Sequence, residues 1–89
     1  MKIGFDPAKR DLTLAARGLD MARAEEIFAT EILTVEDTRL DYGETRFMTV
    51  GYLNSRMVVL VWTLRNSNRR IISLRKANER EQTQYRPSA

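Results

Sequence analysis

The sequence predicts an α+β fold, with helices on one side of a small, mostly antiparallel sheet. Two observations lead to this prediction. The first half of the chain contains two short strand-like runs and two amphipathic helix patterns between them, whereas residues 44–75 consist of strand-like runs joined by short turns. The chain has 89 residues, which suffices for one domain with a small core. We therefore expect residues 1–89 to form a single domain.

The first strand is expected at residues 2–5, and a helix follows it directly. Asp6 is a favourable N-cap, Pro7 suits the first helical position, and Gly18 suits the end of the helix. The apolar face of this helix consists of Ala8, Leu12, Ala15 and Ala16. A second helix is expected after Asp20, and its apolar stripe consists of Met21, Ala24, Ile27 and Phe28. Such stripes usually pack against the core.

The remaining elements are mostly strands. A strand at residues 32–35 precedes a polar connection over residues 36–43, which turns at Gly43. Three further strands are expected at residues 44–53, 57–64 and 69–75. Residues 57–64 are nearly all apolar, so they should form a central strand covered on both faces. A polar helix over residues 77–86, ended by Pro87, should lie partly exposed across the sheet.

The composition excludes several kinds of chemistry. The chain has no Cys and no His, so it has no cysteine nucleophile, thiolate zinc site or histidine base. The acidic residues 36, 37 and 41 resemble a Mg²⁺ site, but we expect a solvated acidic loop there and neither metal nor cofactor. No apolar run is long enough to cross a membrane, and no signal peptide is recognisable, so we expect a cytoplasmic protein without a membrane partner.

The charge is distributed unequally along the chain. Residues 1–45 contain 6 Lys/Arg and 10 Asp/Glu, a net −4, whereas residues 46–89 contain 9 Lys/Arg and 2 Asp/Glu, a net +7. A basic half of this kind favours an anionic partner, most simply a nucleic acid. A solvated basic surface without a ligand is the equal alternative.

The basic residues gather around the last predicted strand. Its centre is apolar and β-branched, and Arg69, Arg70 and Arg75 stand at its ends. Guanidinium groups remain charged and bind phosphate well, so this strand would be a rigid platform for an anion. A regular strand would point Arg70 and Arg75 to opposite faces, because the two residues are five apart. Either Arg75 lies beyond the strand end, or only one of the two arginines faces the ligand.

Several short motifs occur in a characteristic order and spacing. They are Phe5-Asp6-Pro7-Ala8-Lys9, the helix-ending Gly18, Tyr42-Gly43-Glu44-Thr45-Arg46-Phe47 with Gly51, Arg70-Ile71-Ile72-Ser73 with Arg75, and Ala77-Asn78 with Glu81 and Tyr85. Through them the chain resembles, nearly from end to end, the BrnT-type toxins of bacterial toxin–antitoxin pairs. These are small ribonucleases with a RelE-like fold, in the order β-α-α-β, an antiparallel meander and a C-terminal helix.

The resemblance implies a metal-independent RNA endonuclease that inhibits translation. It would cleave by attack of the ribose 2′-OH on the scissile phosphate. The implied partner is a BrnA-like antitoxin that binds DNA, covers the basic groove and represses its own operon as part of the complex. The family often has Lys-His before the glycine of the first helix, where this chain has Ala16 and Arg17, and Asn where it has Thr13. A catalytically impaired module that binds RNA or antitoxin is therefore the alternative.

Five residues are expected to carry the catalysis. Arg46, Arg70 and Arg75 would bind the phosphate and stabilise its extra charge. Glu44 would act as the general base or hold an arginine in place; a neighbouring guanidinium lowers a carboxylate's pKa and makes it a weaker base. Tyr85 would stack on a base or donate a proton, or else only pack the last helix on the sheet.

Further contacts to RNA are expected from four residues. Arg65 and Arg69 flank a turn and would share the face of Arg75, where they would form the rim of a groove. Glu81, like Glu44, would be a base or would position an arginine. Lys9 would add charge from the first helix, although a solvated lysine is the commoner role. The aromatic residues Phe47 and Trp62 are expected in the core.

Overall fold

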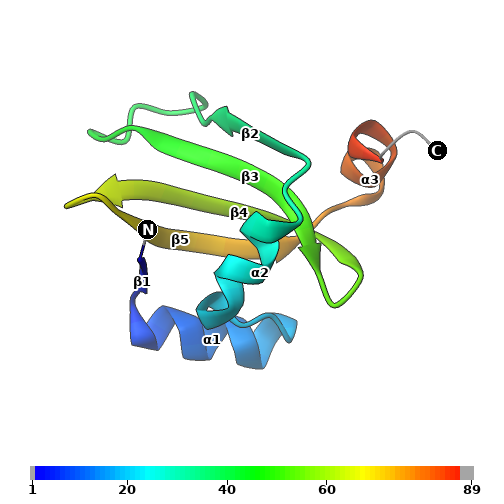
Figure 1. Cartoon of the computed structure of the whole chain (residues 1–89), viewed down its shortest axis with the longest axis horizontal. Helices are drawn as coiled ribbons and strands as arrows, with labels where there is room; N and C mark the ends of the chain where they lie inside the picture. Colours follow the sequence, from blue (N-terminus) through cyan, green and yellow to red (C-terminus); the bar gives the residue numbers. More distant parts are fainter. Residues whose placement is uncertain (1, 87–89) are drawn as a thin grey trace.

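The computed structural model describes residues 2–86 and confirms the α+β class. Within this range, five strands form one sheet in the order β1-β5-β4-β3-β2 (Figure 1). The strands are β1 (Ile3–Phe5), β2 (Leu33–Glu36), β3 (Arg46–Leu53), β4 (Arg56–Arg65) and β5 (Asn68–Lys76). β1 pairs with β5 in parallel, and the other neighbours are antiparallel. Pro87, which was predicted to end the last helix, lies outside the described residues.

Three α-helices accompany the sheet within the described residues. They are α1 (Pro7–Arg17), α2 (Ala24–Ala29) and α3 (Glu79–Tyr85), and a 3-10 turn, η1 (Met21–Arg23), precedes α2. The predicted signals at α1 are confirmed, because the Asp6 carboxylate accepts a hydrogen bond from the backbone of Ala8 and Gly18 adopts a left-handed φ of 69°. Figure 1 shows α1 and α2 beside each other, and α3 at the far end of the sheet.

The hydrophobic side chains form two clusters on opposite faces of the sheet. β4 contributes to both, since Val58, Leu60 and Trp62 join the larger cluster under α2, whereas Met57 and Val59 join the smaller one. The prediction of a central strand covered on both faces is therefore confirmed. Tyr85 of α3 packs against the smaller cluster. The prediction that the helices lie on one side is therefore wrong for α3, which covers one end of the opposite face.

The two N-terminal helices are held in different ways. In α1 the predicted core face is wrong, because its four residues are exposed and Leu12 is 70% exposed. Polar contacts attach this helix instead: Arg10 donates two 2.8 Å hydrogen bonds to Asp20, and Arg17 donates one of 2.7 Å to the Leu74 carbonyl. In α2 the stripe is buried as predicted. A Cβ at Gly51 would lie 2.6 Å from the Ile27 carbonyl oxygen, so the glycine lets α2 approach β3 closely.

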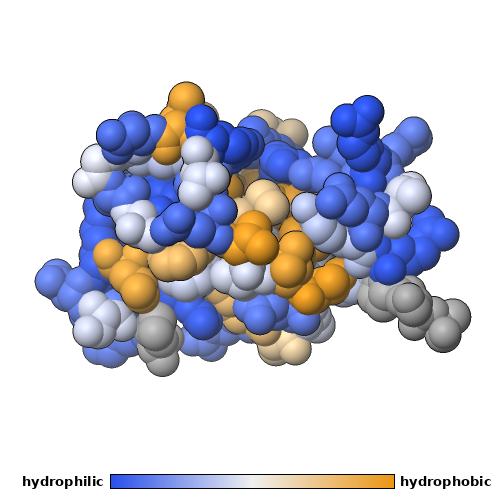
Figure 2. Space-filling view, turned by 90° about the horizontal axis from the view of Figure 1, so that it is seen from above, coloured by the Kyte–Doolittle hydropathy of each residue, from blue (hydrophilic) through white to orange (hydrophobic). Residues whose placement is uncertain are grey.

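The β2 edge of the sheet is left open. β2 pairs only with β3, and its Val35 side chain is exposed. Seen from above, towards this edge, apolar side chains gather near the centre of the molecule between hydrophilic ends (Figure 2). None of the helices in residues 2–86 is long and apolar enough to cross a membrane.

Candidate functional site

A β-bulge in β5 determines which arginines share a face. Val61 of β4 pairs with Ser73, but the next residue, Trp62, pairs with Ile71, so Ile72 is an extra residue on β5. A bulge of this kind places two residues opposite one and shifts the alternation of side chains along the strand. Beyond the bulge, the residues of β5 therefore point to the face opposite to the one a regular strand would give.

This shift brings the three predicted catalytic arginines to one face. Arg46 and Arg70 both pair with Thr63, and Arg75 pairs with Val59, four residues away on the same strand. Paired residues project to the same side of a sheet, as do residues separated by an even number along a strand. All three arginines therefore lie on the face opposite α1 and α2, which we call the open face. Both sequence-based alternatives for Arg70 and Arg75 were wrong, because Arg75 lies within β5 and faces the same way as Arg70.

Arg75 is fixed by a carboxylate from α3. Its guanidinium donates hydrogen bonds of 2.7 and 2.8 Å to the two oxygens of Glu81. The same carboxylate accepts from the backbone of Asn78, and the Asn78 side chain accepts from the backbone of Glu81, which completes a capping box. The hydrogen bonds from Arg75 lower the pKa of Glu81 to about 2. Glu81 is therefore ionised at neutral pH and holds Arg75 in a defined position.

Arg46 is held by a neighbouring carboxylate and an aromatic ring. Its Nε donates a 3.1 Å hydrogen bond to Glu44, and its guanidinium lies 4.0 Å from the centre of the Tyr42 ring. Arg65 reaches the other oxygen of Glu44 at 3.4 Å. The hydrogen bond from Arg46 lowers the pKa of Glu44. Like Glu81, Glu44 is placed to orient an arginine and is a weak base in this arrangement.

Arg70 differs from its two neighbours on the open face. Among residues 2–86 it forms no ion pair. It lines a cavity of about 250 Å³ at the β4–β5 turn, together with Arg65 and Arg69. A Cβ at Gly4 would lie 3.8 Å from the Arg70 side chain, in ordinary contact. Arg70 is therefore the arginine of this group whose charge is available to an anion.

Arg69 borders the cavity at the β4–β5 turn, but its side chain projects to the face opposite to that of Arg46, Arg70 and Arg75. Its guanidinium lies 3.8 Å from the centre of the Phe28 ring and 5.0 Å from that of Trp62, on the face covered by α2. The prediction that Arg69 shares the face of Arg75 is wrong, because it assumed regular alternation through the bulge. Its contacts to the two rings are those of a structural residue. Phe47 and Trp62 stack at 4.7 Å on this side, so both are core residues as predicted.

Two other predicted site residues, Lys9 and Tyr85, are less well placed to contact RNA than the three arginines. Lys9 is exposed on α1, across the sheet from the open face. Tyr85 is half-buried against the smaller hydrophobic cluster, whose members include Met57 and Ala77. Much of the Tyr85 side chain therefore serves to pack α3 on the sheet.

The loop before β3 contributes a group that sequence reasoning missed. Asp37 was expected in a solvated acidic loop, but its side chain is only 2% exposed. It accepts two 2.8 Å hydrogen bonds from Arg39 and one of 3.3 Å from the Tyr42 hydroxyl, and the Arg39 bonds lower its pKa to about 2. Arg39, Asp37, Arg75 and Glu81 line one cavity of about 270 Å³. The i, i+2 spacing of Asp37 and Arg39 was the available signal for this pair.

The described residues contain no cluster of three or more acidic, His or Cys side chains suited to hold a metal ion. The groups gathered on the open face are guanidiniums, and the carboxylates near them are engaged in holding those guanidiniums. Such an arrangement binds and polarises an anion through fixed positive charge.

The fold and the open face define a small α+β protein with a cationic sheet surface suited to a phosphate-bearing ligand. Among known families, residues 5–81 match the family described as ribonuclease toxin, BrnT, of type II toxin-antitoxin system. The match covers most of the chain, which therefore belongs to the BrnT family, and the resemblance found in the sequence motifs is confirmed. No curated protein matches the chain.

Membership of this family sets the general activity and the kind of partner. The protein is a ribonuclease toxin of a type II toxin–antitoxin system, and an antitoxin is its implied partner.

Proposed function

We propose that the protein is a metal-independent RNA endonuclease that uses the arginines of the open face to stabilise the charge of the transition state. The observation that carries this proposal is the gathering of Arg46, Arg70 and Arg75 on one face by the register of β3, β4 and the bulged β5. Fixed cations aimed at developing negative charge are often the largest contribution to catalysis. The chain offers three such cations on a rigid sheet.

The proposed reaction is an internal transfer followed by release. The ribose 2′-oxygen loses its proton to a base and attacks the adjacent phosphorus, while the bond from phosphorus to the 5′-oxygen breaks. The leaving 5′-oxygen takes up a proton, and the products are a 2′,3′-cyclic phosphate and a 5′-hydroxyl. Arg70 would contact the phosphate directly, since its charge is not neutralised within the described residues. Arg46 and Arg75 would flank it in orientations set by Glu44 and Glu81.

The proton transfers belong to weaker candidates. Glu44 lies at the open face beside Arg46 and is the candidate base, although its lowered pKa favours the positioning role. Tyr85 is the candidate proton donor or stacking residue at the α3 end of the face. Arg65 and, from α1, Lys9 would add long-range attraction for the RNA backbone.

The family supports a proposal for the biological setting. We propose that the chain forms one domain with a RelE-like fold, acts in the cytoplasm and slows growth by cutting RNA needed for translation. The partner would be a BrnA-like antitoxin whose own region binds DNA, so that the complex represses its operon. The basic second half of the chain suits an acidic or groove-filling antitoxin segment.

A second candidate is a binding module without catalytic activity. It is motivated by Ala16 and Arg17, which replace the Lys-His common in the family. Two observations favour the active enzyme. Arg17 donates to the Leu74 carbonyl, beside Arg75, and thereby keeps a cation at this position. Ala16 is exposed on α1, away from the open face, so its side chain takes no part in the arginine group.

Purified protein incubated with a defined RNA in the presence of EDTA tests the proposal. We expect cleavage into fragments that end in 2′,3′-cyclic phosphate. Cleavage that stops in EDTA, or fragments with 3′-hydroxyl ends, would contradict the proposed mechanism. RNA that is bound but remains intact would favour the binding module.

A further inference from the structure

A second cationic site lies at the other end of the sheet from the β4–β5 turn. A cavity of about 460 Å³ opens where the β3–β4 hairpin turns and β5 leaves for α3. Its volume lies within the range of about 300–1,000 Å³ that is usual for small-molecule sites. Three of its lining residues are the cations Arg56, Lys76 and Arg86, and none of the nine is a carboxylate. None of these residues belongs to the arginine group described above.

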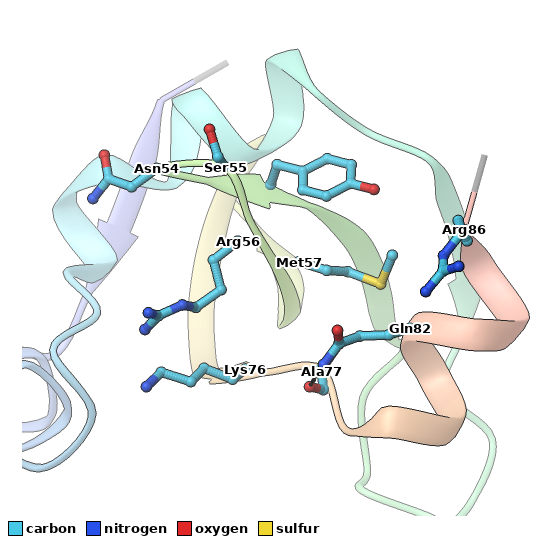
Figure 3. A pocket seen from close by; sticks show the side chains of 9 residues that line it. Asn54, Ser55, Arg56, Met57, Lys76, Ala77, Gln82 and Arg86 are labelled. Atoms are coloured by element: carbon cyan, nitrogen blue, oxygen red, sulfur yellow. Dashed lines mark hydrogen bonds between the residues drawn. The ribbon is translucent and has the colours of Figure 1, made fainter. Parts of the chain in front are cut away.

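Two of the cations at this cavity, Arg56 and Lys76, lie side by side, and none of the three is neutralised within the described residues. Lys76 pairs with Val58, and Arg56 stands two residues before Val58, so both side chains project to the helix-covered side of the sheet, opposite the three arginines of the open face. Figure 3 shows them extending in parallel, with Gln82 and Arg86 on the opposite side of the view and Met57 between the two groups. Within residues 2–86 none of the three cations forms an ion pair. Adjacent like charges repel, and a bound anion would relieve that repulsion.

The remaining lining residues favour a nucleotide over a peptide. Tyr52 supplies an aromatic ring, and Asn54 and Gln82 supply amide groups that both donate and accept hydrogen bonds. Single-stranded RNA is bound by this combination of positive charge for phosphate, a ring for stacking and amides for base edges. A groove for an amphipathic peptide would instead be lined mainly by apolar side chains.

We propose that this cavity, defined by Arg56, Lys76, Arg86 and Tyr52, binds a nucleotide of the substrate RNA that is distant from the cleaved bond. The proposal rests on the ribonuclease function proposed above. Along β4 the two sites are at least about 20 Å apart, because six residues separate Thr63 from Met57 and a strand rises about 3.3 Å per residue. Since Arg56 and Lys76 lie on the helix-covered side, the RNA would pass around the hairpin end of the sheet to reach them. At about 3.4 Å per stacked nucleotide, an RNA needs at least about six nucleotides to span that distance. A shorter RNA occupies only one site.

The test compares two lengths of RNA that lack the attacking hydroxyl. The 2′-O-methyl forms of a 12-mer and a 4-mer are titrated by fluorescence anisotropy against the wild type and the double variant Arg56→Gln/Lys76→Gln. We expect the double variant to bind the 12-mer about tenfold more weakly and the 4-mer unchanged. The salt dependence for the 12-mer should fall by about 1.4 in log–log slope, since each lost contact to a single strand removes about 0.7. Both side chains are exposed, so the variant should fold normally.

A matched control removes the same charge elsewhere. Lys2→Gln/Arg80→Gln eliminates two exposed cations that line none of the cavities described above, and it should bind both RNAs nearly as the wild type does. Equal binding of the 12-mer by the wild type and the Arg56/Lys76 variant would overturn the proposal. A wild type that binds neither RNA would instead contradict the proposed function itself.

Discussion

At the scale of single residues, Arg69 and Arg70 show how neighbours of the same type take different roles. Arg69 stacks on Phe28 and Trp62 on the helix-covered face, whereas Arg70 lies on the open face without an ion partner among the described residues. A guanidinium over aromatic rings contributes about 0.5–2 kcal/mol, and its aliphatic stem adds packing. Arg70 is partly exposed and makes no such aromatic contact, so it should contribute little to stability.

The two alanine variants should therefore differ in stability. We expect Arg69→Ala to lower the free energy of unfolding by about 1–2 kcal/mol, and Arg70→Ala to change it by less than about 0.5 kcal/mol. Urea unfolding followed by fluorescence of Trp62 measures both. Equal effects of the two substitutions would contradict the assigned faces.

At the scale of elements, the sequence predicted most helices and strands but not the register of β5. The N-cap Asp6, the left-handed Gly18 and the apolar run of β4 are local signals, and each was confirmed. The bulge at Ile72 leaves no local signal, because it depends on how β5 pairs with β4. Because the sequence did not reveal this bulge, it could not predict that Arg70 and Arg75 share a face or that Arg69 lies on the opposite one.

The exposed face of α1 has a similar cause. An apolar stripe predicts burial only when another element covers it, and here the Arg10–Asp20 pair and the Arg17 contact hold the helix while Leu12 remains exposed. The candidate site was predictable in its residue types, through Arg46, Arg70 and Arg75. The pairing of Arg46 and Arg75 with the carboxylates of Glu44 and Glu81 was only one of two alternatives, and the buried Asp37 was missed.

The link between α3 and β5 predicts a pH dependence of stability. Arg75 lowers the pKa of Glu81 from 4.5 to about 2, so the stabilising contribution is complete above the unfolded pKa and is lost as the pH falls through about 4.5 towards 2. Glu81→Gln keeps the capping-box hydrogen bond but removes the charge. We expect the difference in free energy of unfolding between wild type and Glu81→Gln to be nearly constant above about pH 5.5 and to shrink as the pH falls from there towards 3. A difference that is the same at every pH would show that the ion pair contributes nothing to stability.

At the scale of the whole molecule, one sheet joins two hydrophobic clusters. The clusters lie on opposite faces, and β4 supplies residues to both, so neither can separate from the sheet without disrupting the other. The Cα radius of gyration of 12.7 Å is that of a compact domain of this size. The larger cluster contains Trp62, the only tryptophan of the chain.

This arrangement predicts two-state unfolding. We expect the urea transition observed by Trp62 fluorescence to coincide with that observed by far-UV circular dichroism, which reports the sheet and helices. Matching midpoints and slopes would support a single cooperative unit. A fluorescence change that precedes the loss of circular dichroism would mean that the cluster under α2 unfolds separately.

The central claim is that the arginines of the open face carry the RNA cleavage, with Arg70 on the phosphate. Its most direct test is the single-turnover cleavage rate of Arg70→Gln, compared with that of Arg80→Gln, which removes an exposed cation on α3. Loss of one preorganised group that stabilises developing charge lowers the rate by about 10²–10³-fold. We expect a loss of that size for Arg70→Gln and almost none for Arg80→Gln. A rate for Arg70→Gln close to that of the wild type would contradict the claim.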